Sequence, residues 1–213
     1  LRLVLLASAA SSAFATLGVD VATSYSTSDW QCVINSGRSF AIVRGWHSFG
    51  AFDSNVVPTV AAAWEAGMAH VDVYLFPCFG KSASEQVDGL LSQLKSNSVR
   101  YGMVWFDIEQ NPSTGCGWSS DLSSNCAYMQ QLVDAAHSSG AAFGVYTSPY
   151  EWSSVMGASC TAGSDLPLWY AHYDGEASFS DYSKIGGWTS PAIKQYSGTS
   201  TLCGREVDLD YYP

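Results

Sequence analysis

The chain has 213 residues, of which 47% are hydrophobic, 14% aromatic and 13% charged, and its formal net charge is −10. This composition excludes a disordered chain and a coiled coil, and the length suits one domain with a substantial core. The nine Lys and Arg residues are scattered along an acidic chain. This argues against binding to nucleic acid or to anionic membranes, because phosphate groups need clustered basic side chains.

The first 15 residues have the features of a signal peptide. Arg2 precedes the apolar run Leu3–Ala10, and Ala13-Phe-Ala15 has the small-x-small form of a cleavage site. The apolar run is too short to span a membrane. We therefore expect a signal peptide over residues 1–15, a mature domain over residues 16–213, and a protein that is secreted or delivered to a vacuole or lysosome.

Short apolar runs that predict strands alternate with amphipathic runs that predict helices over most of the chain. The predicted strands cover residues 17–22, 40–44, 69–76, 103–106, 142–146, 167–172, 192–196 and 206–211. The predicted helices cover residues 30–36, 57–66, 84–95, 126–139 and 150–156. Five strand–helix units followed by three strands predict an α/β fold, an irregular TIM-like barrel in a single domain.

Individual residues mark the ends of the predicted helices. Asp29 is the candidate cap at the start of the first helix. Gly67 and Gly140 follow the second and fourth helices, where glycine commonly ends a helix.

Six cysteines behind a signal peptide predict three disulfides. The expected pairings are Cys116–Cys126, Cys32–Cys78 and Cys160–Cys203. The first would close the Gly/Ser-rich loop after the fourth strand, and the other two are one of three arrangements left open for the remaining cysteines. No Cys-x-x-Cys pair occurs and the four histidines lack ligand spacing, so we expect no metal and no cofactor.

Two acidic residues follow the fourth predicted strand. Because side chains alternate along a strand, Trp105, Asp107 and Glu109 share one face. The two acids lie about 7 Å apart along the backbone, where like charges favour one protonated group. A proton donor beside an anionic partner is what cleavage of a glycosidic bond requires. A pair of surface acids at the start of a loop is the alternative interpretation.

Two further acids lie in predicted strands. Asp20 is inside the apolar first strand, and Asp208 is in the last strand, which neighbours the first when a barrel closes. Active groups of such barrels stand at the carboxyl ends of strands, so these acids and the Asp107–Glu109 pair are expected to converge over one pocket. Taken alone, Asp20 is also consistent with a paired structural acid, and Asp208 with a frayed terminus.

With these residues in hand, the chain resembles the glycoside hydrolases of family 25, lysozymes that cleave bacterial cell-wall peptidoglycan. The matching motifs, in order, are Gly18-Val-Asp-Val, Phe40-Ala-Ile-Val-Arg44, Ala66-Gly67 with Tyr74 in the next strand, Trp105-Phe-Asp-Ile-Glu109, Gly144-Val-Tyr-Thr147, Leu168-Trp-Tyr-Ala-His-Tyr173, Ile193-Lys-Gln-Tyr196 and Val207-Asp-Leu-Asp210. Each motif is common, but their order and spacing together are specific. The resemblance implies an irregular barrel of five βα units closed by three further strands.

The resemblance also implies roles for the acids. Glu109 matches the general acid that protonates the leaving oxygen. Asp107 matches the second catalytic carboxylate, which acts as a nucleophile or steers the substrate's own acetamido group; we expect the acetamido-assisted route, with retention. Asp20 and Asp208 match the family's two other pocket acids. Asp210 stands where the family has an acid or an amide, so Asp208 is preferred.

Four more residues are candidates for binding the sugar. Tyr74, Tyr146 and Trp169 lie at or near strand ends, where aromatic faces and hydroxyl groups suit sugar rings and N-acetyl groups. Gln195 is a polar residue inside an apolar strand. Packing in the core is the alternative role for the aromatics, and a place outside the pocket is the alternative for Gln195.

We therefore expect a monomeric, secreted lysozyme that hydrolyses the β-1,4 bond between N-acetylmuramic acid and N-acetylglucosamine in peptidoglycan. A family 18 chitinase also ends a strand in Asp-x-Glu, but it carries two further Asp where this chain has Met103 and Trp105. An inactive sugar-binding module on the same barrel is expected to have lost one of the four acids. The Gly45–Gly50 loop and the number of cysteines depart from the family's pattern.

Overall fold

The structure is a computed structural model that describes residues 15–213. The predicted signal peptide therefore lies, apart from Ala15, outside the described residues. The strands are β1 Thr16–Val21, β2 Phe40–His47, β3 Ala51–Phe52, β4 His70–Leu75, β5 Val104–Asp107, β6 Phe143–Thr147, β7 Leu168–Ala171, β8 Ile193–Leu202 and β9 Arg205–Tyr212. The helices are α1 Thr27–Asn35, α2 Val56–Ala66, α3 Ala83–Ser96, α4 Leu122–Ser139 and α5 Pro149–Val155.

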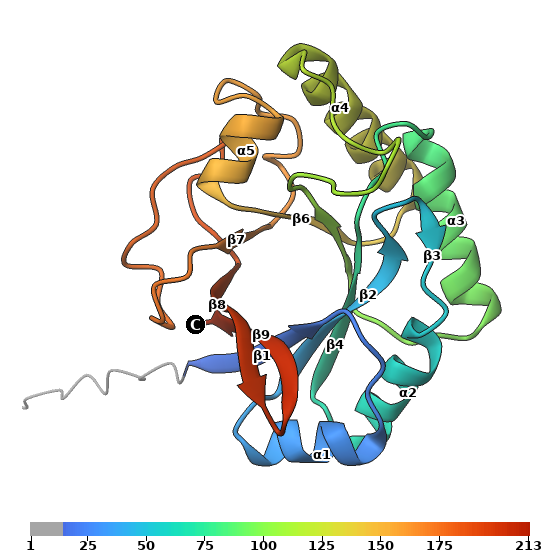
Figure 1. The fold of residues 1–213 in the computed structure, drawn as a ribbon, viewed down its shortest axis with the longest axis vertical. Helices are drawn as coiled ribbons and strands as arrows, with labels where there is room; N and C mark the ends of the chain where they lie inside the picture. The colour runs from blue at the N-terminus through green and yellow to red at the C-terminus, as the bar shows by residue number, and fades with distance from the viewer. Residues whose placement is uncertain (1–14) are drawn as a thin grey trace, which may run out of the picture.

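Eight of the strands close into a barrel, and the helices lie on its outside (Figure 1). Strands β1, β2 and β4 to β8 run parallel around the ring, and β9 lies antiparallel between β8 and β1. Pairing of β1 with β2 completes the ring. The predicted barrel of five strand–helix units followed by three strands is confirmed. The short β3, which pairs with the end of β2, lies where only a loop was expected.

Local sequence signals set the helix ends. Ser26 is the N-cap of α1, because its hydroxyl accepts from the Asp29 N–H while the Asp29 carboxylate accepts from the Ser26 N–H. The prediction of Asp29 as the cap was therefore wrong, since Asp29 is the second half of this reciprocal pair. Gly67 and Gly140 end α2 and α4 in the left-handed region, as predicted, with φ of 95° and 69°. Within residues 15–213, none of the helices is both long and apolar enough to cross a bilayer.

Hydrophobic side chains form two layers, one inside the barrel and one between the strands and the helices. Phe106 and Ile108 belong to the outer layer and are fully buried. The inner layer is mostly aromatic and contains Phe40, Ile42, Tyr74, Trp105, Tyr146, Trp169, Ala171 and Ile193. Gly18 and Gly144 make room for this layer. A Cβ at Gly18 would overlap the ring of Phe40, and a Cβ at Gly144 would overlap the ring of Trp105.

The three disulfides join Cys32 to Cys203, Cys78 to Cys116 and Cys126 to Cys160. All three predicted pairings were wrong. Cys116 lies in the loop between β5 and α4 and bonds to the loop between β4 and α3, whereas Cys126 lies on α4 and bonds to the segment after α5. Neighbours in the barrel, rather than neighbours in the sequence, are therefore linked.

Candidate active site

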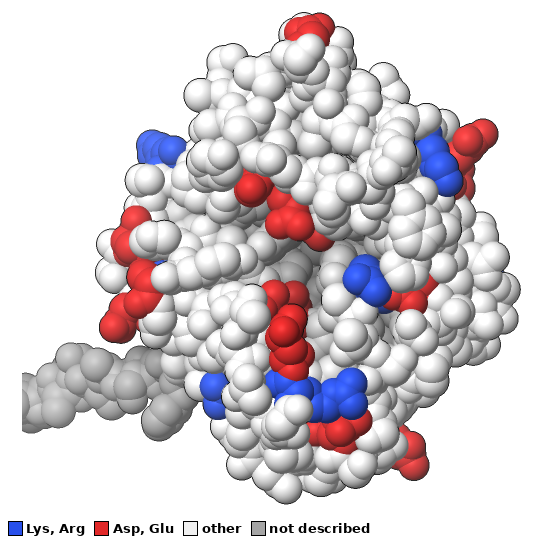
Figure 2. Space-filling view, viewed as in Figure 1, with Lys and Arg blue, Asp and Glu red and all other residues white. Residues whose placement is uncertain are grey.

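A pocket of about 130 Å³ opens at the carboxyl ends of the parallel strands. Figure 2 shows acidic side chains gathered around a hollow at the centre of the molecule's face. The pocket is lined by Asp20, Tyr74, Asp107, Glu109, Tyr146, Trp169, Tyr173, Gln195 and Asp208. All eight residues proposed from the sequence as catalytic or substrate-binding are in this lining, and Tyr173 joins them.

Strand geometry explains how distant acids reach one pocket. Asp107 is the last residue of β5, and Glu109 follows two residues later on the same face, with Trp105 below them inside the barrel. Asp20 in β1 lies directly opposite Asp208 in the antiparallel β9. Because the parallel strands end at one rim, three segments far apart in the sequence bring four carboxyl groups together.

The four carboxyl groups are largely removed from water and repel one another's charge. Burial, followed by the charges of Glu151 and Asp208, raises the pKa of Glu109 to about 7. Burial and the Asp208 charge raise the pKa of Asp20 to about 8. Burial, then the charges of Glu109 and Asp20, raises the pKa of Asp107 well above its usual range. Near neutral pH the pocket therefore retains protons and does not carry four full charges.

Gln195 organises the polar side of the pocket. Its Nε2 donates to the Asp20 carboxyl at 2.7 Å and to the Asp208 carboxyl at 3.4 Å. Its Oε1 accepts from the hydroxyls of Tyr146 and Tyr173 at 2.7 and 2.8 Å. These partners determine the orientation of the amide, because only its nitrogen donates and only its oxygen accepts. One side chain on β8 thus positions two acids and two phenols relative to one another.

The three predicted aromatics have both of the roles considered for them. Tyr74, Tyr146 and Trp169 belong to the inner hydrophobic layer and also line the pocket. The rings of Tyr146 and Trp169 lie 4.5 Å apart, and each of the three side chains is at most 9% exposed. These residues therefore form the floor of the pocket rather than an open platform beside it.

Tyr173 and Asp210 were not selected from the sequence as site residues. Tyr173 follows β7, is 61% exposed and brings its hydroxyl over the pocket to Gln195. Asp210 is fully buried and accepts from the Trp169 indole N–H at 2.9 Å, so it supports the floor, while Asp208 lines the pocket. Alternation along β9, which puts both acids on one face, was the available signal for Asp210.

The Gly45–Gly50 segment, which departs from the family's pattern, forms the end of β2 and the turn to β3. Asn111, two residues after Glu109, donates its Nδ2 to the Ser48 carbonyl at 2.7 Å. Phe49 at the turn stacks on His47, with ring centroids 4.6 Å apart. The Gly45–Gly50 segment is therefore hydrogen-bonded to the loop that follows the candidate acids.

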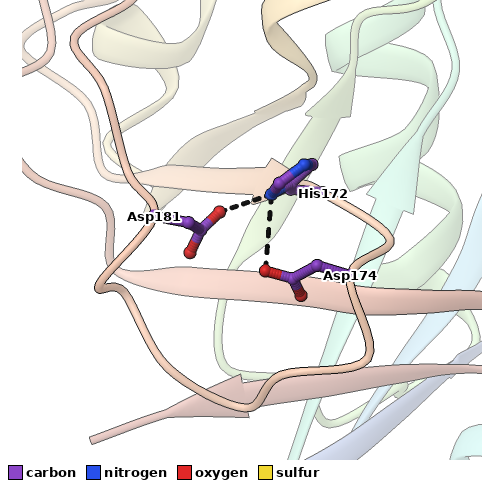
Figure 3. A group of neighbouring side chains, drawn as sticks. All are labelled: His172, Asp174 and Asp181. Atoms are coloured by element: carbon purple, nitrogen blue, oxygen red, sulfur yellow. Dashed lines mark hydrogen bonds and ion pairs between the residues drawn. The ribbon is translucent and has the colours of Figure 1, made fainter.

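A second group of titratable side chains lies on the outer side of β8. The His172, Asp174 and Asp181 side chains point toward one another in the manner of a metal site (Figure 3). The Lys194 ammonium is fully buried, however, and donates to Asp174 and Asp181 at 2.8 Å each. This cation already pairs with both carboxylates, so the group is an ion-pair cluster. Because Lys194 precedes Gln195 in β8, the group supports the outer face of the strand whose inner face lines the pocket.

Replacing Lys194 by Met is expected to destabilise the protein by about 2–3 kcal/mol, because two carboxylates lose their buried counter-ion. The value lies below that for fully buried pairs, since 24% and 21% of the Asp174 and Asp181 side chains are exposed. Urea unfolding followed by tryptophan fluorescence measures the change. The matched control is Lys184→Met at an exposed position of the loop between β7 and β8, which also carries Asp174 and Asp181. Equal unfolding midpoints for the two variants would contradict the role of Lys194.

Comparisons with known proteins agree on one family. The model of the family described as Lysozyme-like protein 1 matches residues 11–196. The chain is 45% identical to Probable GH family 25 lysozyme 4 of Dictyostelium discoideum, over 92% of this chain and 90% of that protein. It is 40% identical to Counting factor 50 of the same organism, over 91% of this chain and 64% of that protein. A family GH25 lysozyme from Aspergillus fumigatus has the same fold, with a TM-score of 0.72 at 22% identity over 93% of this chain and 94% of that chain. The chain thus belongs to glycoside hydrolase family 25, the lysozymes.

Proposed function

We propose that the protein hydrolyses the β-1,4 bond between N-acetylmuramic acid and N-acetylglucosamine in bacterial peptidoglycan, with Glu109 as the general acid. The observation that carries the proposal is the position of Glu109. It is a half-buried carboxyl beside Asp107 at the pocket, with a pKa of about 7 that keeps it protonated in mildly acidic water. Membership of a lysozyme family supports the same substrate class.

In the proposed mechanism, Glu109 donates its proton to the glycosidic oxygen as the bond from that oxygen to C1 breaks. Asp107 orients the acetamido group of N-acetylmuramic acid, whose carbonyl oxygen attacks C1 and forms an oxazolinium ion. Water then adds to C1 and returns a proton to the Glu109 carboxylate. Two displacements at C1 leave its configuration retained.

A free acceptor atom supports the role of Asp107. Its Oδ1 is buried and has no hydrogen-bond partner within residues 15–213. An acetamido N–H from the substrate would satisfy this atom. The positive charge of the oxazolinium ion favours ionised Asp107, whereas burial and the charges of Glu109 and Asp20 raise the pKa of this group in the free pocket.

Six of the remaining lining residues are assigned to the sugar. In the proposal, Asp20, Asp208 and Gln195 form a polar wall for hydroxyl and N-acetyl groups, since they present acceptors and donors in a fixed arrangement. The substrate-binding floor consists of Tyr74, Tyr146 and Trp169. Polar groups that converge over an aromatic floor are typical of sites that bind small ligands.

Activity is expected to fall as the pH rises through about 7, the pKa of Glu109. The sign follows because the general acid must enter the reaction protonated, and its protonated fraction decreases tenfold for each further pH unit. The fall appears as the descending limb, on the alkaline side, of a plot of kcat/KM against pH measured with soluble peptidoglycan fragments. A rate that increases through the same range would contradict the assignment.

Product analysis tests which bond is cleaved. Purified peptidoglycan is digested, its new reducing ends are reduced with borohydride, and the amino sugars are separated after acid hydrolysis. Muramitol is the expected product. Glucosaminitol in its place would indicate cleavage of the other glycosidic bond and contradict the proposal. Binding to peptidoglycan without new reducing ends would instead favour an inactive sugar-binding module.

We also propose that the mature domain begins at Thr16 and acts as a monomer. In this proposal the protein is secreted or delivered to a vacuole or lysosome, and it binds neither nucleic acid nor membranes. Three disulfides support an oxidising compartment. The net charge of −10 supports the absence of phosphate-rich partners.

A further inference from the structure

The segment that carries Glu109 is held by the end of β6 and by its own following loop. The Ile108 N–H donates to the Tyr146 carbonyl at 2.9 Å, and Thr147 Oγ1 donates to the Ile108 carbonyl at 2.8 Å. Trp118 Nε1 donates to the carbonyl of Glu109 itself at 2.7 Å. The backbone before and at Glu109 is therefore fixed by three hydrogen bonds.

Glu151 makes the corresponding contact after Glu109. Its Oε2 accepts from the N–H of Gln110 at 2.8 Å. Glu151 lies three residues after Ser148, the N-cap of α5, a position from which a Glu side chain commonly turns back to the N-cap N–H. Here the carboxylate instead reaches across to the loop between β5 and α4. The side chain thus links α5 to the segment that holds the candidate acid.

Glu151 also brings a negative charge near Glu109 without lining the pocket. After burial, this charge is the largest cause of the raised pKa of Glu109, ahead of Asp208. Arg44 on β2 is a cation whose charge acts on Asp107, and it is paired with Asp53 at 2.8 Å. The other titratable groups that face Glu109 are Asp20, Tyr74, Asp107, Tyr146, Tyr173 and Asp208. Glu151 is the acid that acts on Glu109 from outside the pocket.

We propose that Glu151 is a positioning residue for the general acid: its carboxylate holds the backbone next to Glu109, and its charge favours the protonated Glu109 carboxyl. The inference rests on the proposed role of Glu109. The two effects are separable, because an uncharged amide retains a hydrogen-bond acceptor but carries no charge.

Three variants separate the effects. Glu151→Gln keeps an acceptor for Gln110 and removes the charge, and Glu151→Ala removes both. The control is Glu85→Gln, which changes the same residue at the same distance from the serine N-cap of α3, at an exposed site. Thermal unfolding of each variant establishes that it is folded before its kinetics are compared.

Glu151→Gln is expected to move the descending limb of the kcat/KM profile to lower pH by about half a unit, because Glu109 then loses its proton more readily. At pH values above the midpoint of the descending limb, the activity of Glu151→Gln should be about threefold lower than that of wild type, and at pH values well below the midpoint the two should be nearly equal. Glu151→Ala should show the same shift together with a loss of kcat of about tenfold at every pH, since the acid is also less well placed. A limb for Glu151→Gln that coincides with that of Glu85→Gln would overturn the proposal.

Titration of Glu109 in the free protein gives a readout that does not depend on activity. The chain has six Glu residues, and the Glu109 carboxyl signal in a ¹³C-labelled sample is the one missing from Glu109→Gln. Its midpoint should fall in Glu151→Gln and remain unchanged in Glu85→Gln. If Glu109→Gln retains full activity, the proposed role of Glu109 as the general acid fails, and the role of Glu151 fails with it, whatever the titration shows. If Glu109→Gln is inactive and the midpoint does not move, only the role of Glu151 fails.

Discussion

Replacing Glu109 by Gln is expected to lower kcat on peptidoglycan by about 10²–10⁴-fold, the range typical for loss of a general acid. The amide keeps the size of the side chain but has no acidic proton for the leaving oxygen. The effect is measured as the rate at which reducing ends are released at a pH below 7, where Glu109 of the wild-type protein is protonated. Glu85→Gln, on the exposed start of α3, is the control and should match wild type.

A substrate with a better leaving group distinguishes loss of the acid from a distorted pocket. On a peptidoglycan-derived sugar with an aryl leaving group, which departs without protonation, Glu109→Gln should lose much less of its activity than on peptidoglycan. A distorted pocket would slow both substrates alike. Equal losses on the two substrates would therefore remove Glu109 from the role of acid.

Removing the Cys32–Cys203 disulfide by replacing both residues with Ser is expected to destabilise the protein by about 4 kcal/mol. The two cysteines are 171 residues apart, so their bond restricts the unfolded chain more than either of the other two. For a domain of this size the melting temperature should fall by about 10 °C. Urea unfolding of the oxidised proteins gives the change in free energy.

The comparison variant is the double replacement of Cys126 and Cys160, which are 34 residues apart. Its loss should be smaller by about 1 kcal/mol, because the loop that this bond closes is shorter. Mass spectrometry of a non-reduced digest should find Cys32 and Cys203 in one linked peptide. Finding Cys116 linked to Cys126, as the sequence alone suggested, would contradict the structure at this point.

The barrel could be predicted because its determinants are local. Apolar strand runs alternate with helical ones along the chain, and glycines such as Gly67 and Gly140 end helices by a property of their own backbone. Disulfide partners have no such local signal. Cys116 and Cys126 are close in the sequence, but Cys126 lies one turn into α4, which turns it toward the segment after α5.

The same distinction applies to the pocket. Asp107 and Glu109 were found because strand alternation and a barrel rim determine where they point. The hydrogen bonds of Gln195 and the contact between Glu151 and Gln110 join elements distant in the chain. They depend on side-chain directions at a shared rim, which residue spacing does not report. Tyr173 was not predicted as a site residue because it follows β7 in a loop, where strand alternation does not report the direction of a side chain.

The Cys32–Cys203 bond also determines what happens when a protease cuts the chain once. A single cut anywhere between these residues yields two fragments that stay covalently joined, and for most loops each fragment carries strands of the ring. The joined fragments remain at a high effective concentration, so the barrel can reclose around the cut. A single cut in a surface loop therefore does not separate the acids of the pocket, although these acids come from both ends of the chain and from its middle.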